Sequence, residues 1–168
     1  MLRVPAAAVS FYDVVLWIHV SAVVIGFGGT FAYGVLLTTA ARSDPRSMPG
    51  LLRAIQANDR SLVTIGGILV LVSGIYLAAD RWDFSEVFIG WGIVAVLVLL
   101  GLVHGVFIPT ERRAQEAAER DLEASGTGGE VEFGEAFNRA NKRLAIMGPV
   151  AGVIILLTVY MMVAKPFL

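Results

Sequence analysis

Residues Val87–Ile108 read VFIGWGIVAVLVLLGLVHGVFI, a stretch in which His104 is the single ionisable side chain. Three further apolar stretches lie at Val14–Leu37, Leu62–Ala79 and Leu144–Ala164. An α-helix crosses the ~30 Å hydrocarbon core of a bilayer with roughly 20 residues, so each stretch is about long enough to span it. The sequence therefore predicts an all-α fold, a four-helix transmembrane bundle that runs up-down-up-down.

The composition of the chain agrees with this fold. Apolar residues make up 57% and charged residues 16% of the sequence, whereas soluble domains have roughly 45–50% and about 25%. The net charge of −1 gives no reason to expect a nucleic-acid partner. The absence of cysteine excludes a disulfide framework, a thiolate metal site and a cysteine nucleophile. Residues 1–168 are expected to form one integral membrane domain.

The basic residues are concentrated in two of the three connections, the loops 38–61 and 109–143. Ten of the 13 lysines and arginines lie there: Arg42, Arg46, Arg53, Arg60, Arg112, Arg113, Arg120, Arg139, Lys142 and Arg143. Arg3, Arg81 and Lys165 lie on the other side of the predicted bundle. Cytoplasmic loops of membrane proteins carry the excess of basic residues. We therefore expect a multi-pass protein of the inner (plasma) membrane, with both long loops in the cytoplasm and both termini outside.

Both long loops contain helical extensions of the predicted spans. Turn signals at Ser43–Pro45 and Met48–Gly50 precede a helical pattern at Leu51–Arg60 that leads into the second span. The second loop is predicted to hold helices at Glu111–Ala124 and Glu135–Arg143, separated by a glycine-rich break at 125–129. The two helices of the second loop are expected to be solvated; a docking surface for a partner protein is the alternative.

Small residues recur on every predicted span. They are Ala22, Gly26, Thr30 and Gly34 on the first, Gly67 and Gly74 on the second, Gly101 and Gly105 on the third, and Gly148 and Gly152 on the fourth. Helices associate in membranes by close van der Waals contact, which small residues permit. The pattern predicts tight packing between helices, either within the chain or in a homo-oligomer. Room for an ion or a flat cofactor is the second interpretation.

Two histidines are the ionisable residues within the predicted spans. Such residues are rare and are candidates for function. His19 lies on the small-residue face of the first span, and His104 lies near the end of the third. Both spans run in the same direction, so the two histidines differ in depth by roughly 18 Å at 1.5 Å per residue. One metal ion within a protomer therefore cannot bind both, and His104 is expected to be an interfacial, hydrated group.

His19 has two interpretations. It is either a neutral imidazole that hydrogen-bonds to a neighbouring helix, or a ligand for haem iron or copper. Met161 and Met162 near the end of the fourth span could add thioether ligands, which favour copper(I).

The runs Trp17–Val20 and Gly26–Gly29 resemble the first helix of CopD-like copper-resistance proteins and of HemJ-type protoporphyrinogen oxidases. Over nearly its full length the chain resembles a bacterial family of predicted integral membrane proteins, domain of unknown function 2269. The similarity includes Trp82–Ser85, Pro109–Arg113 and Met162–Pro166. The resemblance implies four membrane helices without an assigned activity. By the more distant analogy, His19 matches a histidine on which HemJ-type proteins depend for haem.

No catalytic motif is recognisable, so no catalytic residue is assigned and an enzyme is not favoured. The first functional hypothesis is a non-catalytic membrane module with the bilayer as its solvent, acting as a scaffold, an assembly factor or a small permeation pathway. The alternative is a membrane redox protein that binds haem b or copper through His19.

Overall fold

The computed structural model describes residues 9–126 and 129–166, and every regular element among them is a helix. In chain order the elements are α1 (Phe11–Phe27), η1 (Gly28–Ala32), α2 (Tyr33–Ser43), η2 (Pro45–Ser47), α3 (Met48–Asn58), η3 (Asp59–Val63), α4 (Thr64–Arg81), α5 (Val87–Leu102), η4 (Val103–Phe107), α6 (Ile108–Ser125) and α7 (Glu135–Ala164). The elements η1 and η2 are 3₁₀ turns, and η3 and η4 are π-helical turns.

These elements join into four long helices, which confirms the predicted fold class. The helices are Phe11–Ser43, Pro45–Arg81, Val87–Ser125 and Glu135–Ala164, with 33, 37, 39 and 30 residues. At 1.5 Å per residue they are roughly 45–60 Å long, well beyond the ~30 Å of a bilayer core. Each span therefore continues as a helix outside the hydrocarbon.

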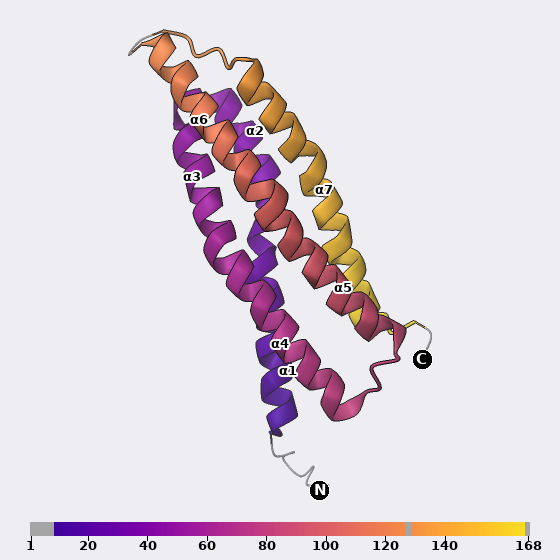
Figure 1. Cartoon of the computed structure of the whole chain (residues 1–168). Coiled ribbons are helices and arrows are strands. Elements are labelled where there is room, and N and C mark those ends of the chain that lie inside the picture. Colours follow the sequence, from indigo (N-terminus) through magenta and orange to yellow (C-terminus); the bar gives the residue numbers. More distant parts are fainter. Residues whose placement is uncertain (1–8, 127–128, 167–168) are drawn as a thin grey trace, which may run out of the picture.

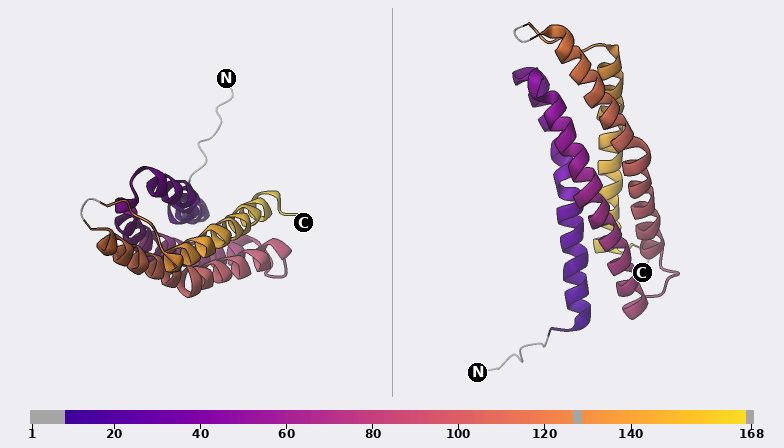
Figure 2. Two further views of the ribbon diagram at one scale, coloured as in Figure 1. Left: turned by 90° about the horizontal axis from the view of Figure 1, so that it is seen from above. Right: turned by 60° about the vertical axis from the view of Figure 1, so that its left-hand side comes forward.

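The four helices run up-down-up-down (Figure 1). The turn at Asp44 and residues 129–134 of the connection between α6 and α7 lie at one end of the molecule, called here the loop end. The turn Trp82–Glu86, the start of α1 and the end of α7 lie at the other end, called here the terminal end (Figure 2). The two loops that contain the basic residues therefore share one end.

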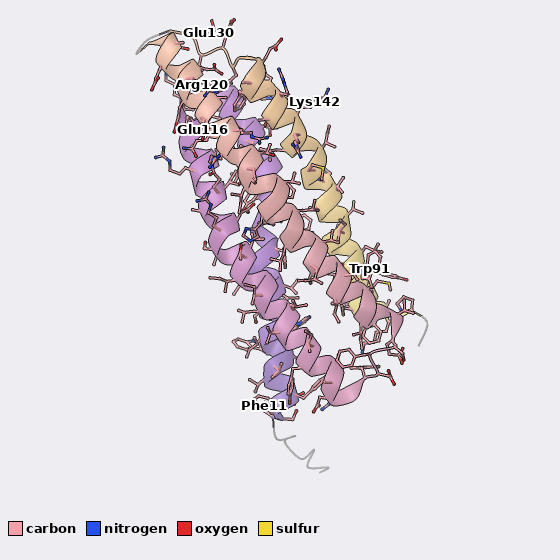
Figure 3. The ribbon with its side chains drawn as sticks, viewed as in Figure 1. Phe11, Trp91, Glu116, Arg120, Glu130 and Lys142 are labelled. Carbon is pink, nitrogen blue, oxygen red and sulfur yellow. The ribbon has the colours of Figure 1, made fainter. Side chains whose placement is uncertain are left out.

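Charged side chains gather at the loop end. Figure 3 shows Glu116, Arg120, Glu130 and Lys142 there, whereas Phe11 and Trp91 lie toward the terminal end. Between the ends, large apolar side chains point outward: Val24, Val94 and Leu156 are 64%, 60% and 60% exposed. An apolar exterior of this kind is stable in lipid rather than in water.

The bundle has three apolar clusters along its length. The middle cluster contains Ala22, Phe27, Val63, Val70, Val96, Leu99, Val103 and Ile155, and the cluster nearest the terminal end contains Ala78, Phe88, Ile89 and Met161. The core toward the loop end contains Met48, Leu52, Ala114, Ala117, Ala118, Phe137 and Leu144. The helical extensions thus pack on one another as a second small bundle instead of standing apart in solvent.

Gly26 of α1 and Gly66 of α4 form a close backbone contact between two long helices. A Cβ atom added at Gly66 would lie 2.7 Å from the Gly26 Cα atom, closer than side-chain carbons approach. Gly67 lies against Leu100, and Gly74 lies against His19. Small residues therefore pack helices α1 and α4 together, as predicted. The partner of Gly26 is Gly66, which was not among the small residues named on the second span.

Other glycines in the predicted stripes face open space. A Cβ atom would meet nothing within 4 Å at Gly34, Gly101, Gly105 or Gly148. For these positions the expectation of a neighbouring helix within the chain was wrong. Packing in a homo-oligomer stays a prediction for them.

Two local expectations at prolines also differ from the structure. Met48–Gly50, expected to be a turn, forms the start of α3, where the missing N–H of Pro49 removes no helical hydrogen bond. The apolar span Leu144–Ala164 alone suggests that Pro149 lies near the start of a helix. Because α7 begins at Glu135, Pro149 instead lies halfway along its 30 residues. The carbonyl of Ala145 therefore receives no helical N–H from position 149.

The turn at the terminal end is short and locally bonded. The Ser85 backbone N–H donates to Asp83 Oδ1 at 2.9 Å, and this hydrogen bond lowers the pKa of the exposed Asp83 carboxyl. Lys165 lies with its Nζ atom 4.0 Å above the centre of the Trp82 ring. The contact between Lys165 and Trp82 holds the end of α7 against the turn that joins α4 and α5.

Candidate functional site

Two acidic side chains, Asp59 and Glu111, are buried where the two halves of the bundle meet. Asp59 begins η3 and is 3% exposed, and Glu111 lies in the first turn of α6 and is 2% exposed. Both side chains line the same cavity. We call these two residues the carboxyl pair. Acidic residues are almost never fully buried without a partner, so the pair requires a physical explanation.

The carboxyl pair lies beside both π-helical turns of the structure. Asp59 is the first residue of η3, and Glu111 follows η4 by one helical turn. A π-helical turn contains an additional residue, which rotates the side chains after it relative to those before it, and such turns are frequent at functional sites. The Thr64 hydroxyl supports η3 by donating to the Asp59 carbonyl at 2.7 Å.

Tyr33 connects α2 to the carboxyl pair. Its hydroxyl donates to Asp59 Oδ1 at 2.9 Å and accepts a hydrogen bond from the side-chain amide of Asn58. Glu111 has no equivalent donor: its Oε2 atom is buried and unpaired among the described residues. A buried acceptor without a partner is destabilising by about 1–3 kcal/mol, so the Glu111 oxygen marks a site with unmet hydrogen-bonding capacity.

A chain of polar side chains leads from the carboxyl pair toward the surface of the loop end. Buried Gln56 donates to Gln115 Oε1 at 2.8 Å, and Gln115 donates to Glu119 Oε1 at 2.9 Å. Glu119 is paired at 3.0 Å with Arg53, an exposed residue. Gln115 lies one helical turn from Glu111, so this chain of polar side chains begins near the carboxyl pair and ends in solvent.

The carboxyl pair and Tyr33 also line a cavity of about 570 Å³. Its walls come from η1 and α2, from the region of both π-helical turns, and from the middle of α7. Most of the lining is apolar, for example Phe27, Val103 and Ile155. The site therefore combines an apolar chamber of ligand size with a small number of convergent polar groups, as binding sites for small molecules do.

His19 is held by α4, away from this cavity. Its Nδ1 atom lies 3.0 Å from Ser73 Oγ, and the Ser73 hydroxyl donates to the Leu69 carbonyl at 2.5 Å. Which of the two atoms donates in the His19–Ser73 hydrogen bond depends on the tautomer of the imidazole ring. A hydrogen bond to a neighbouring helix is what the first interpretation of His19, a neutral structural imidazole, predicts.

Met161 and Met162 lie on α7 and pack against α5 and the end of α4. Met161 is in an apolar cluster with Ala78, Phe88 and Ile89, and Met162 lies against Gly92. Among the described residues, no three histidine, aspartate or glutamate side chains are grouped as a metal site.

His104 is in η4 on the exposed side of the bundle, and its Nε2 atom lies 3.2 Å from Thr64 Oγ1. The hydrogen-bond partners of the two histidines, Thr64 and Ser73, are nine residues apart on one helix, or roughly 13 Å. The sequence indicated a larger separation in depth between the two histidines, roughly 18 Å.

The sequence analysis missed the carboxyl pair because it assigned both residues to charged loops. A signal was present nevertheless. Asp59 continues the helical spacing of Leu52, Ile55 and Val63, and all four are buried. Glu111 likewise lies on the buried face of α6, three residues before the buried Ala114. An acidic residue in phase with an apolar stripe is the pattern that identifies such a site.

Comparison with known proteins assigns the chain to a family. A family model described as "Predicted integral membrane protein (DUF2269)" matches residues 13–166, nearly the whole chain. The chain belongs to this family. It is thus an integral membrane protein, as the four long apolar helices indicate. No curated protein and no solved structure matches the DUF2269 chain.

Proposed function

We propose that this DUF2269 protein is a non-catalytic membrane module with a permeation role, which binds a small membrane-borne molecule in the cavity and exchanges a proton at the carboxyl pair. The observation that carries the proposal is the buried, unpaired Glu111 Oε2 atom, next to Asp59 and in the wall of the cavity. An ionisable residue at such a place in a membrane protein is a functional candidate.

The proton follows from the chemistry of the pair. Two ionised carboxylates in direct contact repel each other, and burial away from water disfavours each charge. One proton held between Asp59 and Glu111 removes the repulsion and gives Glu111 the hydrogen bond that it otherwise lacks. Tyr33, which donates to Asp59, stabilises the remaining negative charge.

We place the path of this proton on the side of the loop end, where Gln56, Gln115 and Glu119 form a hydrogen-bonded chain that begins one helical turn from Glu111. The cavity gives the same pair contact with an apolar ligand. Because protons reach the carboxyl pair from one side and the ligand reaches it from the other, binding of the ligand in the cavity can be coupled to protonation of the pair.

We also propose that the loop end faces the cytoplasm of a bacterial inner membrane. Support comes from the ten basic residues in the two connections that meet there, since basic residues are retained on the cytoplasmic side. The proton route would then start in the cytoplasm, and the terminal end would lie outside.

Photolabelling in proteoliposomes tests the function. The probe is a neutral long-chain alcohol that carries a diazirine, and labelled sites on α7 are located by mass spectrometry. Labelling of cavity-lining residues between Asn141 and Leu156 is expected to change between acidic and alkaline buffer. Asp59→Asn and Glu111→Gln should remove the pH dependence of labelling. Glu116 is an exposed acidic residue on α6, the helix of Glu111, and Glu116→Gln should preserve the pH dependence.

A cavity-filling pair of variants provides the matched control. Gly148 and Gly101 both have open space where a Cβ would be, but only Gly148 lines the cavity. Gly148→Leu is expected to reduce labelling strongly and Gly101→Leu to leave it unchanged. If labelling is the same in acidic and alkaline buffer and is unchanged in Gly148→Leu, the proposed function is excluded.

The haem or copper hypothesis at His19 is a second candidate, and one observation favours it. The Nδ1 atom of His19 hydrogen-bonds with Ser73, and metal-binding histidines are oriented by such a bond at the nitrogen that does not bind the metal. Protein purified from its own host would then show a Soret band or stoichiometric copper that disappears in His19→Ala. A folded, colourless and metal-free protein would eliminate this candidate.

A further inference from the structure

The cavity is elongated along the bundle and its two ends differ. On one wall its lining runs from Phe27 to Arg42, and on the facing wall from Leu156 to Asn141. Each wall covers fifteen residue steps, roughly 22 Å at 1.5 Å per residue. A chamber of this shape suits a chain-like molecule that lies parallel to the helices.

The side of the cavity between α2 and α7 is open to the surroundings. Phe31, Val153 and Leu156 line the cavity and are nevertheless 49%, 63% and 60% exposed. In the bundle, α7 packs against α5 and α6, and α2 packs against α3, with η1 in contact with both α2 and α7. Because apolar side chains form the edges of the opening, it faces lipid and admits molecules from the bilayer.

The end of the cavity toward the loop end is basic. Arg42 lines the cavity, is exposed, and makes no salt bridge among the described residues. Asn141 lines it from α7 and is followed by exposed Lys142 and Arg143. The opposite end is bounded by apolar residues such as Leu99 and Leu156. The cavity is thus complementary to a molecule with one anionic end and one apolar chain.

The carboxyl pair lies between these ends. Asp59 bonds to Tyr33, which is nine residues from Arg42 along α2, or roughly 13 Å. Besides Tyr33, the charged or titratable groups that act on the pair are Arg60, toward Glu111, and His104, toward Asp59. A protonated pair can contact a chain without a large electrostatic penalty, whereas an ionised pair repels a nearby anion and attracts water into the chamber.

We propose that the ligand of the cavity is an anionic lipid from the leaflet that surrounds the loop end. Its acyl chain lies between α2 and α7, and its phosphate group is bound by Arg42 with Lys142 and Arg143 at the rim. Protonation of the carboxyl pair favours the bound state, and loss of the proton releases the lipid. This ligand assignment rests on the proposed function, since it names the molecule that the cavity binds.

The test uses the full-length protein in proteoliposomes and two diazirine-bearing lipids, phosphatidylglycerol and phosphatidylcholine, with identical chains. Phosphatidylglycerol is expected to label the cavity face of α7 several-fold more than phosphatidylcholine, and more in acidic than in alkaline buffer. Arg42→Gln should remove the preference for phosphatidylglycerol, and Arg42→Lys should retain most of it. Gly148→Leu should reduce labelling by both lipids, and Gly101→Leu should not. Size-exclusion chromatography of each variant confirms that it is folded.

Three results would overturn the ligand assignment: equal labelling by the two lipids, an unchanged preference in Arg42→Gln, or stronger labelling by a diazirine-bearing cationic amphiphile. In each case, labelling by the neutral probe that still depends on pH and on Gly148 leaves the proposed function standing. If none of the probes labels the cavity, both proposals fail together.

Discussion

Glu111 is a buried acidic residue with an unmet hydrogen bond: one of its carboxyl oxygens has no donor among the described residues. Evolution of a structural core would replace such a group with an apolar side chain of similar size. Exchanging buried ionic groups for apolar ones is often neutral or stabilising. A residue that reduces stability and yet lines a cavity is therefore expected to act in function.

We predict that Glu111→Leu leaves the free energy of unfolding unchanged or raises it by up to about 3 kcal/mol, because the orphaned oxygen disappears. The same variant should lose the pH dependence of probe labelling. Thermal unfolding in detergent, followed by circular dichroism, measures the first effect. A strong loss of stability would instead assign Glu111 a structural role.

Tyr33→Phe tests the hydrogen bonds on the other side of the pair. The variant leaves Asp59 Oδ1 without its 2.9 Å donor and Asn58 without its acceptor. The free energy of unfolding is expected to fall by about 1–3 kcal/mol. Tyr160→Phe, at an exposed position, is the control and should be neutral in the same unfolding measurement. Equal effects of the two variants would contradict the role given to the Tyr33 hydroxyl.

At the scale of elements, the contact between α1 and α4 depends on two glycines. In a membrane, the attraction between helices comes mainly from close packing, so a glycine at the crossing allows more contacts than a larger residue. The crossing of Gly26 and Gly66 also brings η3, which follows α3, next to α1. The position of Asp59 is thus linked to this contact.

Gly66→Ala is expected to lower the free energy of unfolding by about 1–3 kcal/mol, because its Cβ would lie 2.7 Å from the Gly26 Cα atom. The control is Gly101→Ala, where a Cβ meets nothing within 4 Å. This change should be neutral or stabilising by up to about 1 kcal/mol, since alanine favours helices over glycine. Unfolding titrations in mixed micelles compare the two; a Gly66→Ala protein as stable as the wild type would disprove the tight crossing.

For the whole molecule, the distribution of charge sets the expected orientation in the membrane. Both basic connections meet at the loop end, and the short turn between α4 and α5 lies at the terminal end. The positive-inside rule relates this asymmetry to the cytoplasm.

Single cysteines test the orientation directly, because the chain has no cysteine of its own. In intact spheroplasts, a membrane-impermeant maleimide is expected to label Ser85→Cys, at the terminal end. Glu130→Cys, at the loop end, should react after permeabilisation and not before. Both positions are exposed in the folded protein, so burial does not explain a difference. The reverse pattern would invert the proposed topology.

The sequence by itself determined the four spans, the helical extensions, the break after Ser125 and the clustering of basic residues at one end. These properties are local, since they depend on how many consecutive residues dissolve in hydrocarbon and on where charges interrupt them. Part of the predicted break, residues 127–128, lies outside the described residues. The same local reasoning misplaced Pro149, because an apolar span marks the membrane and not the start of the helix.

The tertiary structure decided which polar residues are buried and which glycines meet. Asp59 and Glu111 are 52 positions apart in the sequence, and their burial depends on α2, α6 and both π-helical turns converging at one level. Likewise, Gly26 lies against Gly66, whereas Gly101 and Gly148 face open space. Periodicity shows which face of a helix is apolar, but the partner of that face is a property of the packed bundle. For this reason the cavity and its carboxyl pair became visible only in the folded molecule.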